Sequence, residues 1–505
     1  MNLHAAETEI DLLEGVLTQA APGDDLIAAK VALAWHLRQR DSARALRLVQ
    51  QVMPVLGAAA HGDGLAACHT RAALAAAEAS AFYCEFDEAE RCLQDARAHL
   101  APPWDPQAEG DAWLVESLIA KGRGQREREL DALDRAVSFF ELSATPERLA
   151  VARVWALFER PLMQRDTREL EFPAPAASAA PELHVAWKAI RDAAHATALS
   201  HRDPGAAAAI FKRASLQAAG LGMVHLEVTC MLQAGASTHE LGDYDLAARC
   251  FDVAAARARQ TGWPTLMGVC DTRIGELLCD LGAFEESLEL LRESIDTLSP
   301  CPRGLVLASA HAALARTLLA MGRLQESLPP VREAIELFRL AGSGPDLAPN
   351  LILQARVLAA LDQPDEALAV LGEAAPLIDE FRLDALRLGV CDVLADVHHR
   401  FTLPPPPGMT LPTAALHYAE AMLRDGLRID GWKPRAALRA FLSERWAEVG
   451  DHARAYEFAR QALVDKEQET AQKMSYPLAL LRARRRAEVR DIPLRHPAAA
   501  ADLSQ

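Results

Sequence analysis

Residues 241–258 read LGDYDLAARCFDVAAARA and contain the structural unit that decides the fold of this chain. A Gly-Asp-Tyr turn is followed by a small, a large and a small side chain at Ala247, Phe251 and Ala254. Spacings of four and three residues place these side chains on one face of a helix. Small and large side chains that alternate on one face allow two helices to approach closely and interlock. The stretch therefore predicts a helix packed tightly against a neighbouring helix.

The same turn returns every forty residues along the middle of the chain, at Arg202, Gly242, Gly282, Gly322 and Asp362. A period in this range is typical of stacked helical or mixed repeats. Each turn is followed by the same pattern of small, large and small residues: Ala207, Phe211 and Ala214; Ser287, Leu291 and Ser294; Ser327, Val331 and Ala334; Ala367, Leu371 and Ala374. The register extends outward to about ten repeats over roughly residues 25–465. The sequence thus predicts an all-α fold, an α-solenoid of stacked helix-turn-helix repeats forming a superhelix.

The first helices of the central repeats contain glycines one period apart, at Gly235 and Gly275. Glycine inside a helix costs about 1 kcal/mol relative to alanine, so it needs a structural reason. We expect that a Cβ at either position would block the close approach of the paired helix.

The pattern resembles the tetratricopeptide repeat, a helix-turn-helix unit with this small–large–small spacing in its second helix. The likeness is strongest at residues 241–254 and good for the next three repeats. The usual unit has about 34 residues, so a forty-residue period implies longer helices. Long-helix variants are similar to the sensor arrays of bacterial signalling proteins such as diguanylate cyclases. The Gly-Gly-Asp/Glu-Glu-Phe signature of a cyclase output domain is absent from this sequence, so the resemblance implies no cyclase activity.

Composition divides the chain into predicted segments. Phe172 to Glu182 is rich in proline and alanine, which is typical of a loop or hinge between two arrays. The predicted organisation is an arm or cap at 1–24, degenerate repeats at 25–172, a linker at 173–182, the regular array at 183–401, a proline-rich insertion at 402–412, the last repeats at 413–465, an extended arginine-rich helix at 466–491 and a disordered tail at 492–505.

Charge and motifs exclude several classes of function. A net charge of −17 argues against general nucleic-acid binding. The sequence contains no stretch of about twenty apolar residues, so it predicts no membrane span. The acidic N-terminus does not resemble a signal peptide. The nine cysteines include no Cys-x-x-Cys pair, and no phosphate-binding, dinucleotide, serine-hydrolase or zinc-protease motif occurs. We therefore expect a cytoplasmic protein that is not an enzyme and has no cofactor and no metal.

Candidate binding residues lie on the first helices, which line the concave face in the family that this chain resembles. Glu276, Arg316 and Arg356 occupy equivalent positions in consecutive repeats. Because packed helices lie about 10 Å apart, two arginines so placed could grip a carboxylate or a phosphorylated segment. The alternative is that Arg316 forms an ordinary surface salt bridge with Glu276. Three further candidates lie nearby on the same helices: Thr272, Arg273 and Asn350.

A second basic cluster lies near the C-terminus, in the predicted extension of the last helix. It is either a solvated capping helix or a docking surface for an acidic partner, and nucleic acid is the less favoured ligand. Its members are Arg482, Arg484, Arg485, Arg486 and Arg490.

The hypothesis that best fits these features is a non-catalytic, regulatory or sensory scaffold that binds a peptide or partner protein on its concave face. The alternative is the sensor part of a signalling enzyme, of the diguanylate cyclase type, whose catalytic domain is lost or encoded separately. A transcription regulator with a ligand-binding array is the weakest hypothesis, because no helix-turn-helix segment stands outside the repeats.

Overall fold

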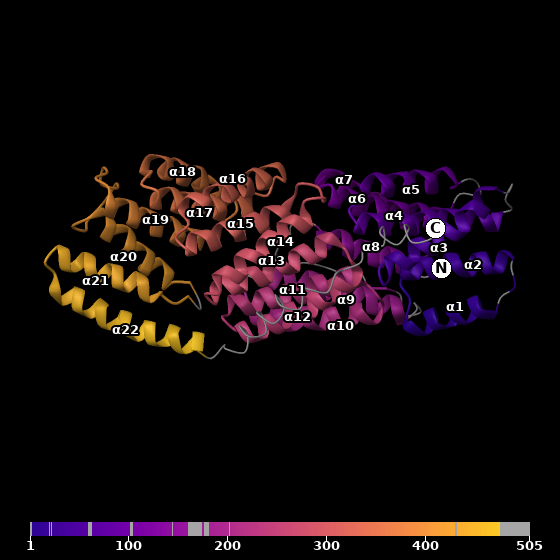
Figure 1. The fold of residues 1–505 in the computed structure, drawn as a ribbon, viewed down its shortest axis with the longest axis horizontal. Helices are drawn as coiled ribbons and strands as arrows, with labels where there is room; N and C mark the ends of the chain where they lie inside the picture. Colours follow the sequence, from indigo (N-terminus) through magenta and orange to yellow (C-terminus); the bar gives the residue numbers. More distant parts are fainter. Residues whose placement is uncertain are drawn as a thin grey trace, which may run out of the picture. The chain divides into compact units, whose positions relative to one another are not determined.

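The computed structural model describes residues 3–19, 21, 23–58, 63–100, 105–143, 145–159, 174–175, 181–200, 202–429 and 432–474. Within these ranges every regular element is an α-helix, which confirms the predicted all-α fold (Figure 1). The helices of the N-terminal part are α1 Glu7–Gln19, α2 Asp24–Leu37, α3 Ser42–Ala58, α4 Asp63–Phe82, α5 Phe86–Ala98, α6 Pro106–Gly122, α7 Arg126–Leu142 and α8 Pro146–Glu159.

The central helices follow the predicted register. They are α9 Pro181–Leu199, α10 Pro204–Gly220, α11 Val224–Glu240, α12 Tyr244–Thr261, α13 Pro264–Asp280, α14 Phe284–Leu298, α15 Leu305–Ala320, α16 Leu324–Leu340, α17 Gly344–Ala360 and α18 Pro364–Glu380. The last four are α19 Leu386–Arg400, α20 Ala414–Gly426, α21 Ala436–Glu448 and α22 His452–Met474.

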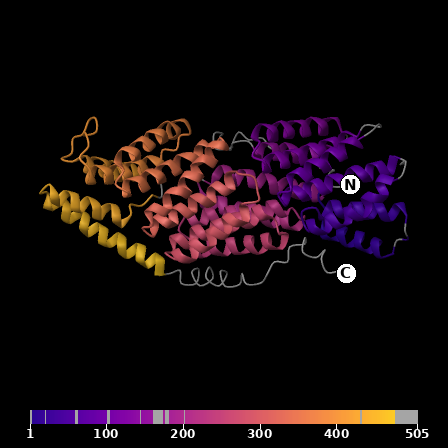
Figure 2. The same ribbon diagram turned by 45° about the horizontal axis from the view of Figure 1, so that its top comes forward.

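Consecutive helices pack against each other in pairs, as α4 does with α5 and α17 with α18 (Figures 1 and 2). Among the described residues ten such pairs run from α2–α3 to α21–α22, with α1 and α8 outside them. The predicted stack of about ten helix-turn-helix units is therefore confirmed. Residues 160–172, the end of the predicted degenerate repeats at 25–172, lie outside the described residues.

Short left-handed turns set the forty-residue period. Glycines with positive φ recur at intervals of twenty residues or a multiple of twenty, at Gly222, Gly242, Gly262, Gly282, Gly322 and Gly342. A left-handed residue ends a helix without steric cost when it is glycine. Each helix of about 17 residues, such as α11 or α16, is thus followed by a three-residue turn. Two helices and two turns make one repeat.

The structure divides into two compact units. Unit 1 contains Met1–Ile274 and Asp296–Arg303, and unit 2 contains Gly275–Ile295 and Gly304–Arg485, insofar as these ranges are described. The predicted linker at residues 173–182 is described only at 174, 175, 181 and 182. The predicted segment boundaries therefore stay a prediction.

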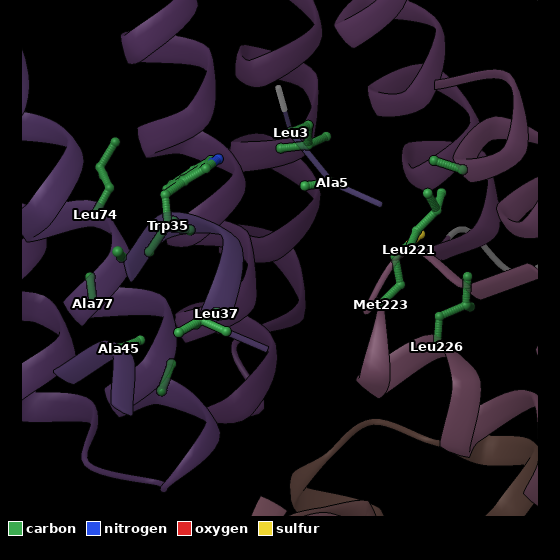
Figure 3. Packing of buried hydrophobic residues seen from close by; sticks show 14 of the residues in the cluster. Leu3, Ala5, Trp35, Leu37, Ala45, Leu74, Ala77, Leu221, Met223 and Leu226 are labelled. Carbon is green, nitrogen blue, oxygen red and sulfur yellow. The ribbon is translucent and has the colours of Figure 1, made fainter. Parts of the chain in front are cut away.

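The core of unit 1 joins segments that are far apart in the sequence. One hydrophobic cluster contains Trp35 and Leu37 of α2 together with Leu221 and Leu226 near the start of α11 (Figure 3). The ring of Trp263 stacks on Phe82 with centroids 4.0 Å apart, and its Nε1 donates to Ser42 Oγ at 3.2 Å. The N-terminal repeats and residues 204–274 therefore share one core.

The residues of the repeat pattern are tightly packed in both units. All three pattern positions of α12 are buried, with Ala247 and Phe251 at 0% exposure and Ala254 at 1%. A Cβ on Gly235 would lie 2.4 Å from Phe251 Cε1, and one on Gly275 would lie 2.7 Å from a methyl carbon of Leu291. Both distances are too short for real contacts. The expectation that these glycines permit close helix approach is confirmed.

One detail of the predicted register is wrong. The sequence after the proline-rich insertion has the spacing of the small–large–small pattern at Ala414, Tyr418 and Ala421, which predicts that these residues are buried. The fully buried positions of α20 are instead Ala415, Leu416 and Ala419. The proline-rich insertion before this helix shifts the register. In α7 the register holds. The sequence has Glu129 at the small position, and this residue is buried, with its carboxylate accepting a hydrogen bond from Arg126 Nη1 at 2.8 Å.

Ala247→Phe is expected to lower the free energy of unfolding by about 1–3 kcal/mol or more, because the larger ring must force the helix pair apart. Val253→Phe is the matched control, since Val253 lies on the same helix and is 54% exposed. Thermal unfolding followed by circular dichroism checks the result. Equal melting temperatures for the two variants would contradict the assigned register.

Candidate functional site

Charged side chains on four first helices of unit 2 form the candidate site, which we call the charged ladder. Arg316 of α15 donates from Nη2 to Glu276 Oε1 of α13 at 2.7 Å. Arg356 of α17 donates from Nη2 to Asp392 Oδ2 of α19 at 2.8 Å. The predicted members Glu276, Arg316 and Arg356 thus lie on successive first helices, and Asp392 extends the ladder. Asp392 was missed because it falls 36 residues after Arg356, about one helical turn short of the period.

The pairs of the charged ladder are open to solvent. The side chains of Arg316 and Glu276 are 48% and 15% exposed, and those of Arg356 and Asp392 are 44% and 47% exposed. Burial lowers the pKa of Arg316, but the carboxylates of Glu276 and Asp280 outweigh burial and raise it. Exposed ion pairs contribute about 1 kcal/mol or less. These arginines can therefore exchange a protein carboxylate for another anion at small cost.

The other predicted ligand-binding residues make internal contacts. Thr272 is buried, and its Oγ1 donates to the carbonyl of Gly268 at 2.8 Å. Asn350 Nδ2 donates to the carbonyl of Asp346 at 2.7 Å. Both polar groups thus bond the backbone of their own helix. Arg273 is half-buried on α13. A binding role for these three residues stays a prediction, and the contacts of Thr272 and Asn350 do not support it.

The predicted docking arginines of the last helix lie outside the described residues. The described part of α22 reaches Met474, nine residues beyond the end of the predicted last repeat at residue 465. The continuation of this helix and the role of Arg482, Arg484, Arg485, Arg486 and Arg490 therefore stay predictions.

A second set of charges on first helices, in unit 1, is buried. Asp111 of α6 accepts from Arg71 Nη1 of α4 at 2.5 Å and from Arg148 Nη2 of α8 at 2.9 Å. The Asp111 side chain is 0% exposed, and those of the two arginines are 9% and 6% exposed. Burial would raise the pKa of Asp111, but the charges of Arg148 and Arg71 outweigh burial and lower it to about 2. With no open face, this cluster is structural.

The buried charges continue around Trp35, whose ring is contacted by two guanidiniums. The Cζ atoms of Arg38 and Arg71 lie 3.9 and 4.3 Å from the ring centroid. Arg38 also donates from Nε to Glu78 Oε2 at 2.7 Å. Sequence reasoning missed these residues, although Arg38 and Glu78, like Arg71 and Asp111, lie forty residues apart. The signal that could have found them is an oppositely charged pair separated by one period.

One cluster in unit 1 has residue types that can bind a metal. His69 of α4 lies beside Asp95 and His99 of α5, with ligand atoms within 4.8 Å of one another. His69 Nε2 lies 2.9 Å from Asp95 Oδ2, and the two imidazole rings stack with centroids 3.7 Å apart and planes 18° from parallel. Ring lone pairs lie in the ring planes, so two stacked rings cannot both aim at one ion about 2.0–2.1 Å away. This arrangement does not fit a zinc site.

In the part of the chain that the structure describes, no helix combines the length and apolar character that a membrane crossing requires.

The repeat prediction is supported by comparison with known families. Residues 269–340 match the model of the tetratricopeptide repeat. This match runs from within α13 to the end of α16 and includes Glu276 and Arg316 of the charged ladder. The chain therefore contains tetratricopeptide repeats, as predicted. No curated protein matches the sequence significantly.

Several solved structures resemble this chain at low identity. The Cut9–Hcn1 hetero-tetramer of the APC/C is 13% identical over 94% of this chain and 87% of that chain, with a TM-score of 0.46. The Rap conjugation gene regulator of plasmid pLS20, in complex with the Phr* peptide, is 12% identical over 72% and 96%, with a TM-score of 0.43. Aspartyl phosphate phosphatase F from Bacillus subtilis is 9% identical over 72% and 94%, also with a TM-score of 0.43. None of these three similarities transfers a ligand or an activity, and none shows a likeness to diguanylate cyclases.

Proposed function

Because residues 269–340 are tetratricopeptide repeats, we propose that this chain is a regulatory protein-interaction scaffold that binds an acidic or phosphorylated segment of a partner protein. The binding surface is the charged ladder, and Arg316 and Arg356 are the residues that contact the ligand. The observation that supports the proposal is that each arginine is about half exposed and donates a hydrogen bond to a carboxylate of a neighbouring first helix. We also infer that the role is non-catalytic and cytoplasmic.

The existing ion pairs show the kind of group that each arginine accepts. Each pair uses one Nη2 donor of a guanidinium that has five N–H donors. Donors thus remain for a second carboxylate or a phosphate. The acids Glu276 and Asp392 hold the two side chains in place before a ligand arrives, which reduces the ordering cost of binding.

The overall charge of −17 makes the proposed recognition selective. An acidic segment is repelled by the general field of such a chain and must gain its affinity from local contacts. Helices α15 and α17 pack against each other, so their two arginines can act on one extended segment. We therefore expect a ligand with two anionic groups spaced to reach both Arg316 and Arg356.

Affinity capture from native cell extract tests this proposal with the full chain and two charge-reversed variants. Arg316→Glu with Arg356→Glu is expected to lose the captured partner by at least about tenfold, because two charge-assisted contacts become repulsive. Arg339→Glu with Arg424→Glu is the matched control. Arg339 and Arg424 lie on the second helices α16 and α20, are 42% and 63% exposed, and pair with Glu373 and Asp425.

Circular dichroism of each variant verifies that the helical content is unchanged. Capture that is lost in the ladder variant and kept in the control supports the proposal. If the same partner is captured equally by the ladder variant, the charged ladder is not the binding surface.

A further inference from the structure

Two cysteines that are far apart in the sequence meet in unit 1. Cys84 lies in the turn between α4 and α5, and Cys301 lies in the connection between α14 and α15. Their Sγ atoms are 2.8 Å apart across a separation of 217 residues. A disulfide bond is about 2.05 Å long, so the two sulfurs need to move together by less than 1 Å. Thr265 Oγ1 lies 3.3 Å from Cys84 Sγ.

The backbone at Cys84 is unusual for a cysteine. Its φ is 63°, in the left-handed region, where a side chain is sterically disfavoured. Most equivalent turns of other repeats have glycine there, at Gly124, Gly242, Gly282 and Gly322, although Asp362 also has a positive φ, of 61°. The cysteine thus occupies a position that the repeat architecture would fill more easily with glycine.

The surroundings hold both sulfurs in place. On one side, Phe82 stacks on Trp263, and the hydroxyl of Tyr83 donates to the carbonyl of Thr261 at 3.2 Å. On the other side, Cys301 lies between two prolines, and its N–H donates to the carbonyl of Leu298 at 2.9 Å. Both cysteines are therefore fixed close to a buried core rather than carried on free loops.

The two thiols differ in acidity. The hydrogen bond from Cys84 lowers the pKa of Cys301 to about 7, against the opposing effect of burial and with help from Thr265. The same hydrogen bond raises the pKa of Cys84. Burial raises the pKa of the Cys230 thiol to about 12. Since the thiolate is the reactive form, Cys301 is the nucleophile of this pair at neutral pH.

Solvent reaches the pair. Cys84 and Cys301 are both half-buried and line an open cavity of about 800 Å³ in unit 1. Gln50, Arg123 and Pro302 also line this cavity. A small oxidant therefore has a path to the sulfur atoms.

We propose that Cys84 and Cys301 form a reversible disulfide when the protein meets a peroxide. The Cys301 thiolate attacks one peroxide oxygen, the O–O bond breaks, and the product is a sulfenic acid and, for hydrogen peroxide, hydroxide that takes up a proton to give water. The Cys84 sulfur then attacks the sulfenic sulfur, loses its proton, and a second water leaves as the S–S bond forms. Two electrons pass from the dithiol to the peroxide, and a small-molecule dithiol reverses the reaction by exchange.

Peptide mapping of the full chain tests this proposal directly. The reduced protein is treated with hydrogen peroxide at a few equivalents, alkylated, and digested with trypsin without reduction. Trypsin places Cys84 in residues 72–91 and Cys301 in residues 293–303, and neither peptide contains another cysteine. We expect a linked pair of these two peptides that is two hydrogens lighter than their sum, and a loss of two of the nine thiols. Dithiothreitol should restore both thiols.

Cysteine variants and alkylation kinetics complete the test. Cys84→Ser and Cys301→Ser should each abolish the linked peptide, whereas Cys92→Ser, a half-buried cysteine of the same unit, should leave it intact. The rate of Cys301 alkylation should rise with a midpoint near pH 7 in the wild type and at higher pH in Cys84→Ala. The proposal is overturned if peroxide oxidises Cys301 to a sulfinic acid without the link, or if the link forms mainly with another cysteine. Because the mapping uses the wild-type chain, a variant that fails to fold does not remove the test.

Discussion

Asp111→Ala is expected to lower the free energy of unfolding of unit 1 by about 3–5 kcal/mol, the cost of removing one partner from a buried ion cluster. Arg71 and Arg148 would lose their shared carboxylate while their side chains are only 9% and 6% exposed. A buried guanidinium without a counter-charge keeps its desolvation penalty and gains nothing in return. The substitution also removes both acceptors of the three hydrogen bonds that Arg71 and Arg148 donate to Asp111.

Urea unfolding combined with hydrogen exchange in peptides from α4, α6 and α8 measures this effect. Glu141→Ala is the matched control, because Glu141 pairs with Arg153 across two helices of the same unit at 2.6 Å, with both side chains 40% exposed or more. The control should cost about 1 kcal/mol or less. Similar losses for the two variants would show that the Asp111 cluster is not desolvated in solution.

The period of the sequence predicts which residues face each other, but not how deeply they are buried. Glu276 and Arg316 lie forty residues apart and form an exposed pair, while Arg71 and Asp111 have the same spacing and form a buried one. The difference comes from what covers each pair. Trp35 lies against Arg71, and Arg148 contacts Asp111 from 37 residues away, out of register with the repeat. The forty-residue period does not predict that Trp35 and Arg148 pack over the Arg71–Asp111 pair.

The fold itself could be predicted well because each repeat is local. The turn at Gly242 and the buried pattern at Ala247, Phe251 and Ala254 depend on contacts within one or two repeats. Contacts that span several repeats could not be predicted in this way. The rings of Phe82 and Trp263 stack with centroids 4.0 Å apart, although the residues are 181 positions apart in the sequence. Neither residue belongs to a sequence pattern from which this contact could be predicted. The Cys84–Cys301 contact belongs to the same class and was missed for the same reason.

Acid is expected to destabilise unit 1 through a second buried group, His36 of α2. The residue is 5% exposed, and burial together with the charges of Arg38, Arg40 and Arg71 lowers its pKa from 6.5 to about 3. Glu9 Oε1, 3.6 Å from Nε2, favours the protonated form, but it is 36% exposed and does not offset those effects. His4 lies in the same environment, and burial also lowers its pKa well below 6.5.

The sign of the pH dependence follows from proton binding in the two states. Between pH 6.5 and about pH 3 the unfolded chain binds a proton at His36 and the folded chain does not. The free energy of unfolding therefore has its full value above pH 6.5. Below pH 6.5 the His36 proton lowers it by about 1.4 kcal/mol for each pH unit. Asp111, whose pKa is lowered from 3.8 to about 2, adds a further loss only below pH 3.8.

Urea midpoints measured across this pH range, with hydrogen exchange in α2, test the prediction. Between pH 6.5 and pH 4, His36→Gln should reduce the slope of the unfolding free energy against pH by about 1.4 kcal/mol per pH unit, the contribution of one proton, because the glutamine amide stays neutral. His4→Gln should remove the separate contribution of His4 to this slope. His452→Gln is the control, since His452 is exposed and its ring is solvated in both states. An unchanged slope in His36→Gln would mean that His36 already takes up its proton in the folded protein. Glu9 would then be the counter-charge of a buried ion pair, and Glu9→Gln should destabilise the protein most strongly at acid pH.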